Sequence, residues 1–195
     1  MAETVSNTAR NAAPSASGRI GALFVLLAFT LAQGCATKLT KPAVPPQPTT
    51  VKLSTFETVT MKKVEIAPEF ASAGANQKAA RKINEVLVYN MRMVFPNLRE
   101  ASGEDVQTGL LIEPLIQEIK FIGGAARFWV GAMAGSSAVL IKVSFRDAST
   151  GELIGEPQFY RAANAYTGGW SMGSTDNRML EDIAKDIVNY ATLNR

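Results

Sequence analysis

The clearest hydrophobic pattern in the chain is a two-residue alternation over residues 138–147. Apolar side chains alternate there with polar ones, which predicts a strand with one buried face and one solvated face. A second strand-like run, residues 110–122, contains Pro114, and this proline predicts a bulge or an edge position. A third strand is expected over residues 153–166, paired back as a hairpin through the turn residues 147–152.

Two other segments carry apolar residues at the spacing of an amphipathic helix, from about residue 76 to 94 and from about 176 to 193. Short strands are expected near residues 59–66 and 98–101. The stripes predicted to face the core are Ala79, Ile83, Val86, Leu87, Asn90 and Met93 in the first helix, and Met179, Leu180, Ile183, Ile187, Tyr190 and Ala191 in the second. These elements predict an α+β fold, with two amphipathic helices packed on one face of a mainly antiparallel sheet.

An apolar run of thirteen residues, 20–32, follows a basic N-terminal segment and predicts a secretion signal. The run is shorter than the roughly 20 residues that a membrane-spanning helix needs. Gly34 and the only cysteine of the chain, Cys35, come shortly after it. We therefore expect signal cleavage after Gly34 and lipid attachment at Cys35. Ordinary secretion is the alternative, because the residues before Cys35 also fit a small-x-small cleavage site.

The segment Leu31-Ala32-Gln33-Gly34-Cys35 resembles the lipobox of bacterial lipoproteins, where leucine, a small residue and Gly or Ala precede the cysteine. Ala32 departs from this pattern, because leucine is usual at its place. The resemblance implies that residues 1–34 are a lipoprotein signal peptide and that palmitate-type chains on Cys35 insert into the lipid bilayer. In such lipoproteins, Ala36 after the cysteine implies an outer-membrane anchor, with the domain facing the periplasm.

The rest of the chain divides into a tether and a domain. Residues 35–50 hold the cysteine and four prolines, without apolar periodicity. This composition predicts an extended tether, which at ~3.1 Å per residue could lift the domain some 40–45 Å from the bilayer. Residues 51–195 are long enough for a single periplasmic domain with its own core.

Composition narrows the functions that fit the chain. Histidine is absent, and the single cysteine is assigned to lipid, so the usual general base and the soft metal ligands are missing. Outside residues 1–34, 18 basic and 16 acidic side chains are spread along the sequence. That balance is too weak to indicate nucleic acid. We expect no enzyme activity, no cofactor and no metal.

One motif taken alone indicates a hydrolase. Residues 169–173 fit G-x-S-x-G, the nucleophile elbow, with Ser171 at its centre. That serine needs an imidazole to accept its proton, and the chain contains no histidine. We therefore interpret the segment as a loop before the last helix, with Ser174 or Asp176 as the helix cap.

The glycine- and alanine-rich segment 122–137 allows two interpretations. It contains the bulky residues Phe128, Trp129 and Met133 beside the basic Arg127. These side chains could fold back onto the core, as part of a long hairpin connection. Alternatively, they form an exposed contact for a partner protein, a second copy or the bilayer, because aromatic residues on a pliable loop present a large binding area.

Residues 131–154, GAMAGSSAVLIKVSFRDASTGELI, resemble a recurrent signature of small bacterial lipoproteins of unassigned function. The layout is also similar to the α/β domains of envelope-assembly lipoproteins, such as the amino-terminal domain of TolB and the curli secretion lipoprotein. These resemblances imply a non-catalytic binding or assembly component of the cell envelope, with an envelope protein as its partner. Two alternatives remain open. One is a self-assembling structural or secretion-ring lipoprotein, a homo-oligomer, and the other is a carrier of a small apolar ligand.

Overall fold

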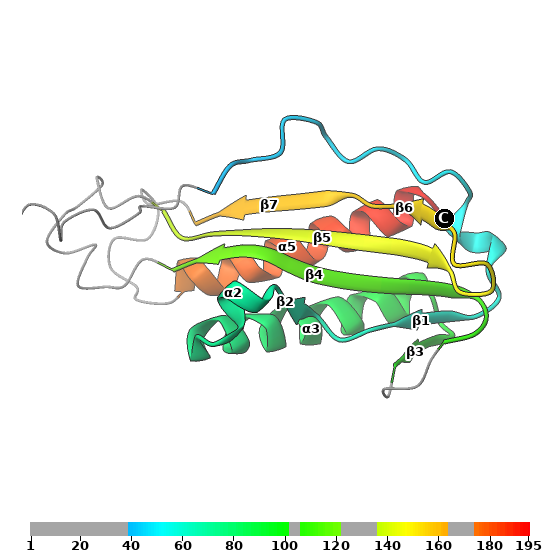
Figure 1. Cartoon of the computed structure of the whole chain (residues 1–195), viewed down its shortest axis with the longest axis horizontal. Coiled ribbons are helices and arrows are strands. Elements are labelled where there is room, and N and C mark those ends of the chain that lie inside the picture. The colour runs from blue at the N-terminus through cyan, green and yellow to red at the C-terminus, as the bar shows by residue number, and fades with distance from the viewer. Residues whose placement is uncertain (1–38, 102–105, 122–135, 164–173) are drawn as a thin grey trace, which may run out of the picture. The chain divides into compact units, whose positions relative to one another are not determined.

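The computed structural model describes residues 39–101, 106–121, 136–163 and 174–195 (Figure 1). Residues from Leu39 to Arg195 pack as one unit. The described elements, in chain order, are η1 (Leu53–Thr55), β1 (Val59–Met61), β2 (Glu65–Ile66), α2 (Pro68–Ala71), α3 (Gly74–Val94), β3 (Leu98–Glu100), β4 (Leu110–Lys120), β5 (Ala138–Asp147), β6 (Leu153–Gly155), β7 (Gln158–Ala162) and α5 (Ser174–Leu193).

The strands form one mixed sheet in the order β3-β1-β4-β5-β6, with β2 beside β4 and β7 beside β5. β1 runs parallel to β3 and β4, and β2 runs parallel to β4. β5 runs antiparallel to β4, β6 and β7. The predicted α+β class is confirmed, but the sheet is not antiparallel throughout. The reason is α3, which carries the chain back after β2, so that the strands before and after it run in the same direction.

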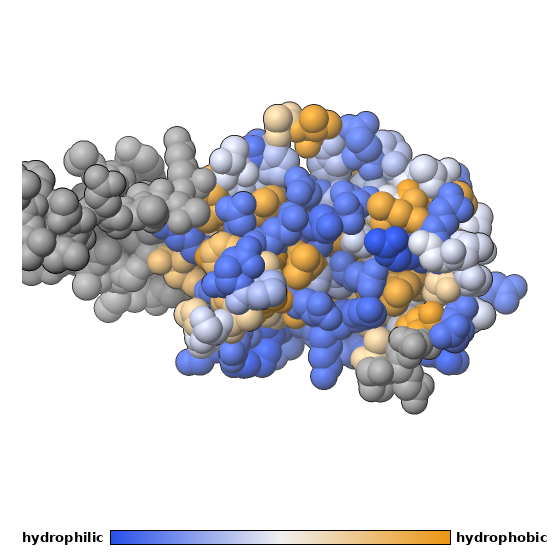
Figure 2. Space-filling model, in the orientation of Figure 1, coloured by the Kyte–Doolittle hydropathy of each residue, from blue (hydrophilic) through white to orange (hydrophobic). Residues whose placement is uncertain are grey.

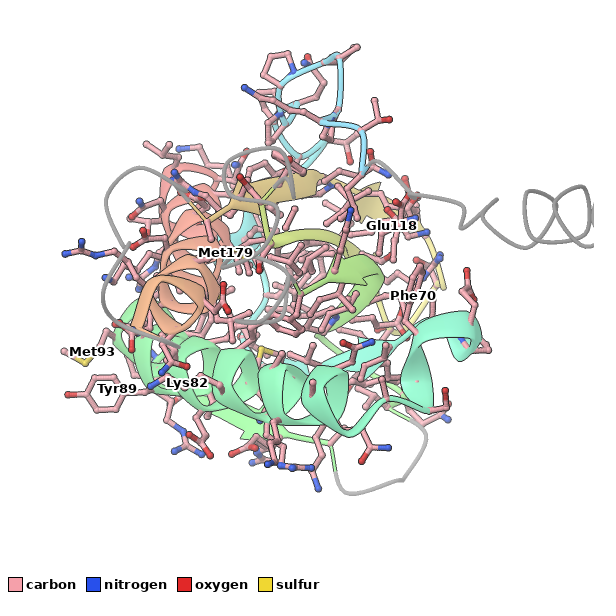
Figure 3. The ribbon with its side chains drawn as sticks, turned by 90° about the vertical axis from the view of Figure 1, so that its left-hand side faces the viewer. Phe70, Lys82, Tyr89, Met93, Glu118 and Met179 are labelled. Atoms are coloured by element: carbon pink, nitrogen blue, oxygen red, sulfur yellow. The ribbon has the colours of Figure 1, made fainter. Side chains whose placement is uncertain are left out.

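The two long helices cover one face of this sheet, and the hydrophobic core lies between the two layers (Figure 3). Its largest fully buried side chains include Ile83 and Leu87 from α3, Ile183 and Ile187 from α5, and Phe145 from β5. The apolar stripe predicted for the second helix is buried over its whole length. The predicted placement of both helices on one face is therefore seen in the structure.

The end of α3 differs from the prediction. Met93 was expected in the core, yet 76% of its surface is exposed, while Met91 and Val94 are buried instead. A helix advances about 100° per residue, so Met91 falls on the same side as Leu87 and Met93 falls beyond the border of that side. The core-facing side of α3 is thus rotated relative to the predicted stripe.

Pro114 lies inside a central strand, and the bulge that it predicts occurs further along β4. The register with β5 shifts between Ile116 and Glu118, whereas Pro114 lies opposite Val143. On the other side of β4, β1 pairs with residues 110–112 and β2 with residues 115–116. Pro114 therefore falls between two partner strands, where a residue without an N–H group costs the sheet little.

The core face predicted for β5 is confirmed, because all four of its apolar residues are fully buried. The other face is solvated only in part, since Leu140 and Ser144 are buried as well. In the following turn, the Asp147 carboxylate accepts a hydrogen bond from the Ser149 amide (2.8 Å), and Gly151 has a positive φ of 75°. The expected third strand is two short strands, β6 and β7. They are separated at Pro157, and the β5–β6 register shifts at Phe145.

Candidate binding surfaces

The residues that the sequence marks as functional lie outside the described part of the structure. Gly34 and Cys35 precede residue 39, the contact candidates Arg127, Phe128, Trp129 and Met133 belong to residues 122–135, and Ser171 belongs to residues 164–173. Their predicted roles therefore stay predictions. The described residues nevertheless fix where the chain enters and leaves these segments.

All three segments begin or end at the same end of the sheet, which we call the loop end. Lys120 pairs with Ala138 at the last position of the β4–β5 ladder, and these strand ends flank the segment that holds Phe128 and Trp129. Ala162, which lies just before segment 164–173, pairs with Ala138 as well. Leu39 is the first described residue, and it packs against Ala138, Leu140 and Tyr160.

The proline-rich segment 39–50, which we call the strap, contacts the domain near its two ends and arches away from it between them (Figure 1). At its first residue, Leu39 is only 8% exposed. Near its other end, the Gln47 carbonyl accepts a hydrogen bond from the Tyr190 hydroxyl (2.7 Å), and the Thr49 amide donates to Asn194 Oδ1 (2.9 Å). The Thr50 amide then donates to the carbonyl oxygen of Ile154 (3.0 Å).

Sequence reasoning did not anticipate these strap contacts. The available signal was Leu39, which with Val44 is one of two large apolar residues in a proline-rich stretch. The partner that receives the strap, Tyr190, is held by ring contacts to Phe145 and Phe159, at centroid distances of 5.6 and 5.7 Å. Burial also raises the pKa of the Tyr190 phenol, which keeps its hydroxyl protonated as the donor to Gln47.

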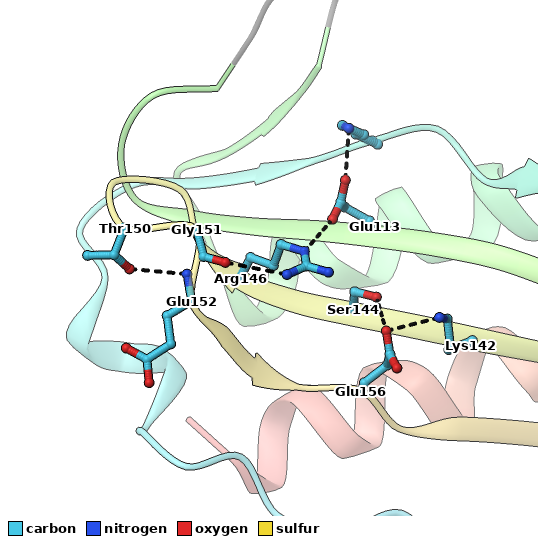
Figure 4. Close-up of polar contacts among 9 residues, drawn as sticks. Glu113, Lys142, Ser144, Arg146, Thr150, Gly151, Glu152 and Glu156 are labelled. Carbon is cyan, nitrogen blue, oxygen red and sulfur yellow. Dashed lines mark hydrogen bonds and ion pairs between the residues drawn. The ribbon is translucent and has the colours of Figure 1, made fainter.

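The sheet face away from the helices carries a network of charged side chains (Figure 4). Glu113 of β4 accepts from the Lys62 amine at 2.8 Å and from Arg146 Nε at 3.2 Å. Arg146 also reaches the carbonyl oxygen of Gly151 in the turn after β5 (3.4 Å). These contacts join three neighbouring segments across the solvated face of the sheet.

A second group on the same face is centred on Glu156. Its carboxylate accepts from the Lys142 amine at 3.0 Å and from the Ser144 hydroxyl at 2.9 Å. The hydrogen bond from Lys142 holds the pKa of this carboxyl below its ordinary value, although partial burial opposes the shift. Nearby, the Gln158 amide donates to the Gln117 side chain at 2.8 Å.

Both carboxylates, Glu113 and Glu156, have structural partners. Each is paired with a cation, and the depressed pKa of Glu156 favours a permanent negative charge. Among the described residues, no three acidic, cysteine or histidine side chains are close enough together to hold a metal ion. In Figure 2 this face is mainly hydrophilic, with hydrophobic residues scattered over it.

The opposite side of the molecule exposes two large side chains of α3. Tyr89 and Met93, one helical turn apart, are 72% and 76% exposed and point away from the sheet (Figure 3). An ion pair between Lys82 of α3 and Glu181 of α5 (3.1 Å) joins the two helices on the surface. In the parts of the chain that the structure describes, every helix is too short or too polar to span a lipid bilayer.

Comparisons with known proteins give similarity at the level of structure alone. No protein-family model and no curated protein matches the sequence. The PelC dodecamer from Paraburkholderia phytofirmans is 12% identical, and the match covers 74% of this chain and 91% of that chain, with a TM-score of 0.42. A DUF330 protein from Xanthomonas campestris is 10% identical, with 80% and 91% covered and a TM-score of 0.48.

A minor lipoprotein from Acinetobacter baumannii is 13% identical, with 70% of this chain and 92% of that chain covered and a TM-score of 0.35. The similar structures thus include bacterial lipoproteins. Because every one of these TM-scores is below 0.5, the similarities assign no residue and no function to this chain.

Proposed function

We propose that this protein is a membrane-anchored lipoprotein that acts as a non-catalytic binding or assembly component of the bacterial cell envelope. The observation that carries the proposal is the order of segments at the N-terminus. A signal-like apolar run is followed by Gly34 and Cys35, and the folded unit begins only four residues later, at Leu39. The domain is on the outer membrane, and it faces the periplasm.

The described part of the domain fits a binding role. Its charged groups form cross-strand pairs on the open face of the sheet. The space between sheet and helices is filled by core side chains, and many of them are fully buried. A small apolar ligand, the third possibility from the sequence, would have to displace this core, so the carrier function is the least favoured.

The anchor is tested on full-length protein expressed in a bacterial host with two membranes. Mass spectrometry of the N-terminal peptide should show that the mature chain starts at Cys35 and carries acyl chains. Cys35→Ala is the control, and it should leave the protein uncleaved and without palmitate label. An unmodified thiol at Cys35 in the wild-type protein would contradict the proposal.

The binding role is tested by crosslinking in living cells. A photo-reactive residue on the open sheet face, at Gln117 or Gln158, should capture a discrete envelope protein, identified by mass spectrometry. The same residue at Ser149, in the turn after β5, serves as the comparison position. Identical capture patterns at all three positions would argue against a specific partner on this face.

A second candidate is self-assembly, which is favoured by the exposed pair Tyr89 and Met93. Contiguous exposed apolar side chains are typical of contact sites. One protein with a similar structure, PelC, is a dodecamer. Light scattering on the purified protein should then give an oligomer that the double variant Tyr89→Ser/Met93→Ser dissociates. Dissociation by Phe128→Ser/Trp129→Ser instead would place the contact in segment 122–137, and a wild-type monomer would exclude self-assembly.

A further inference from the structure

The strap decides which end of the domain lies next to the anchor. We propose that the loop end of the sheet rests on the lipid bilayer, held there by the strap and the acylated Cys35. This inference depends on the lipid anchor of the proposed function. It replaces the picture of a domain lifted from the membrane by a free tether.

The first step is the position of Leu39. Its side chain is 8% exposed and packs on Ala138, Leu140 and Tyr160, at the loop end. The strap residues after it run along the domain to Ile154 and Asn194, near the opposite end of β5. The chain therefore approaches the domain at the loop end. The strap then extends along the side of the domain, away from the anchor.

The second step is the length of chain between the anchor and Leu39. Three residues, 36–38, lie between Cys35 and Leu39, so four residue steps join the two. Even fully extended, these four steps span at most about 14 Å. β5 runs from Ala138 to Asp147, and nine steps of a strand cover about 30 Å. The anchor can therefore reach the loop end, but it cannot reach the turn after β5 while Leu39 stays in place.

The third step is what keeps the strap in place. Both of its ends are fixed, Leu39 by apolar packing and residues 47–50 by hydrogen bonds to α5 and β6. Four prolines between Leu39 and Thr50 restrict the backbone of this stretch. A restricted segment loses less conformational entropy on docking than a flexible one. The strap thus holds the chain against the domain at two points and does not act as a flexible spacer between the domain and the anchor.

The occupant of the loop end is the bilayer, because the acyl chains on Cys35 must insert in it. Lys41, which follows Leu39 by two residues, is exposed. Its amine would lie among the headgroups, where anionic lipids attract basic side chains.

The test is energy transfer between the protein and a labelled membrane. Mature lipidated protein has its only native cysteine consumed by the anchor, so one introduced cysteine can be labelled uniquely. Ala162→Cys places a fluorophore at the loop end, and Ser149→Cys places it in the turn after β5; both positions are exposed. Each protein is reconstituted into vesicles of phosphatidylethanolamine and phosphatidylglycerol containing rhodamine-labelled lipid.

We expect transfer at least about twofold higher from position 162 than from position 149, because the strand between the two ends is about 30 Å long. Leu39→Ser should reduce the difference, and its packing cluster is separate from the main core, so the domain keeps its fold. Inserting a Gly/Ser linker of ten residues between Thr37 and Lys38 should abolish the difference while leaving every strap contact intact.

Equal transfer from the two positions in acylated wild-type protein, or higher transfer from position 149, would overturn this inference alone. Mass spectrometry of the same preparation reports the acyl chains on Cys35. A protein without them would overturn the proposed function and this inference together.

Discussion

Among the glycines that the structure describes, Gly109 has the least room for a side chain. Its φ is +87°, and a Cβ atom there would collide with the hydroxyl and carbonyl oxygens of Thr58. Gly151 also has a positive φ, of 75°, but nothing lies within 4 Å of its Cβ position. A substitution at Gly151 would therefore cause backbone strain alone, whereas one at Gly109 would cause strain and a steric collision.

We expect Gly151→Ala to lower the free energy of unfolding by about 1–2 kcal/mol, which is the cost of a left-handed backbone in an L-residue. Gly109→Ala should cost a further 1–3 kcal/mol or so, because Thr58 must also move. Urea denaturation of both variants measures the difference. Equal losses would show that Thr58 adjusts without cost.

Glu156 makes the stability of the domain depend on pH. Because Lys142 lowers its pKa in the folded state, the pairing stabilises the fold above pH 4.5, the ordinary value, and the effect is lost as the pH falls through the folded-state pKa. Glu156→Gln should therefore be less stable than wild type at pH 7, by about 0.5–1 kcal/mol for a partly exposed pair. The difference should vanish at acid pH.

Thermal unfolding between pH 2.5 and 7 measures this difference. A double-mutant cycle with Lys142→Met is the control, because the two substitutions should be non-additive if the ion pair carries the effect. A constant difference between wild type and Glu156→Gln across the pH range would contradict the assignment.

At the scale of elements, α3 shows how burial and not residue type sets the cost of a substitution. Ile83 is fully buried, whereas Met93 is 76% exposed. Ile83→Ala should cost about 2–5 kcal/mol of unfolding free energy. Met93→Ala should stay within about 0.5 kcal/mol of wild type. Chemical denaturation tests both, and a large loss for Met93→Ala would restore the stripe predicted from the sequence.

The elements themselves were largely predictable, because amphipathic periodicity is a local signal. The alternation in β5 and the apolar stripe of α5 locate their elements to within a few residues. The direction of pairing was not predictable in the same way, because β1 pairs with β4 across the whole of α3. The side of α3 that faces the core was also misplaced near Met93, since it depends on where the sheet lies.

The candidate site was less predictable than the fold. Cys35, Phe128 and Trp129 were chosen from local motifs, and they fall outside the described residues. The strap was missed because its contacts join residues far apart in sequence. Thr49 and Asn194 are 145 positions apart, and no local pattern indicates such a pair.

At the scale of the whole molecule, Asn194 ties the strap to the last helix. It accepts from the Thr49 amide (2.9 Å) and donates to the Tyr190 carbonyl (2.8 Å). Asn194→Ala should lower stability by about 1 kcal/mol, as for the loss of one to two hydrogen bonds. It should also speed hydrogen exchange at the Thr49 amide selectively, as measured by mass spectrometry.

Asn189, exposed on α5, is the matched control position. Asn189→Ala should leave exchange of the strap amides unchanged. If both variants changed the exchange rate equally, the effect would belong to the helix and not to the strap.

The strap contacts also impose an order in time. A protein chain is made from its N-terminus, so residues 39–50 exist long before Tyr190 and Asn194. The strap cannot be fully seated until the last helix has been made and folded, because two of its hydrogen-bond partners, Tyr190 and Asn194, belong to the final residues of the chain. If Cys35 carries the proposed lipid anchor, a chain that stalls before α5 would be held at the membrane with the second half of its strap loose. Seating of the strap thus marks the completion of the chain.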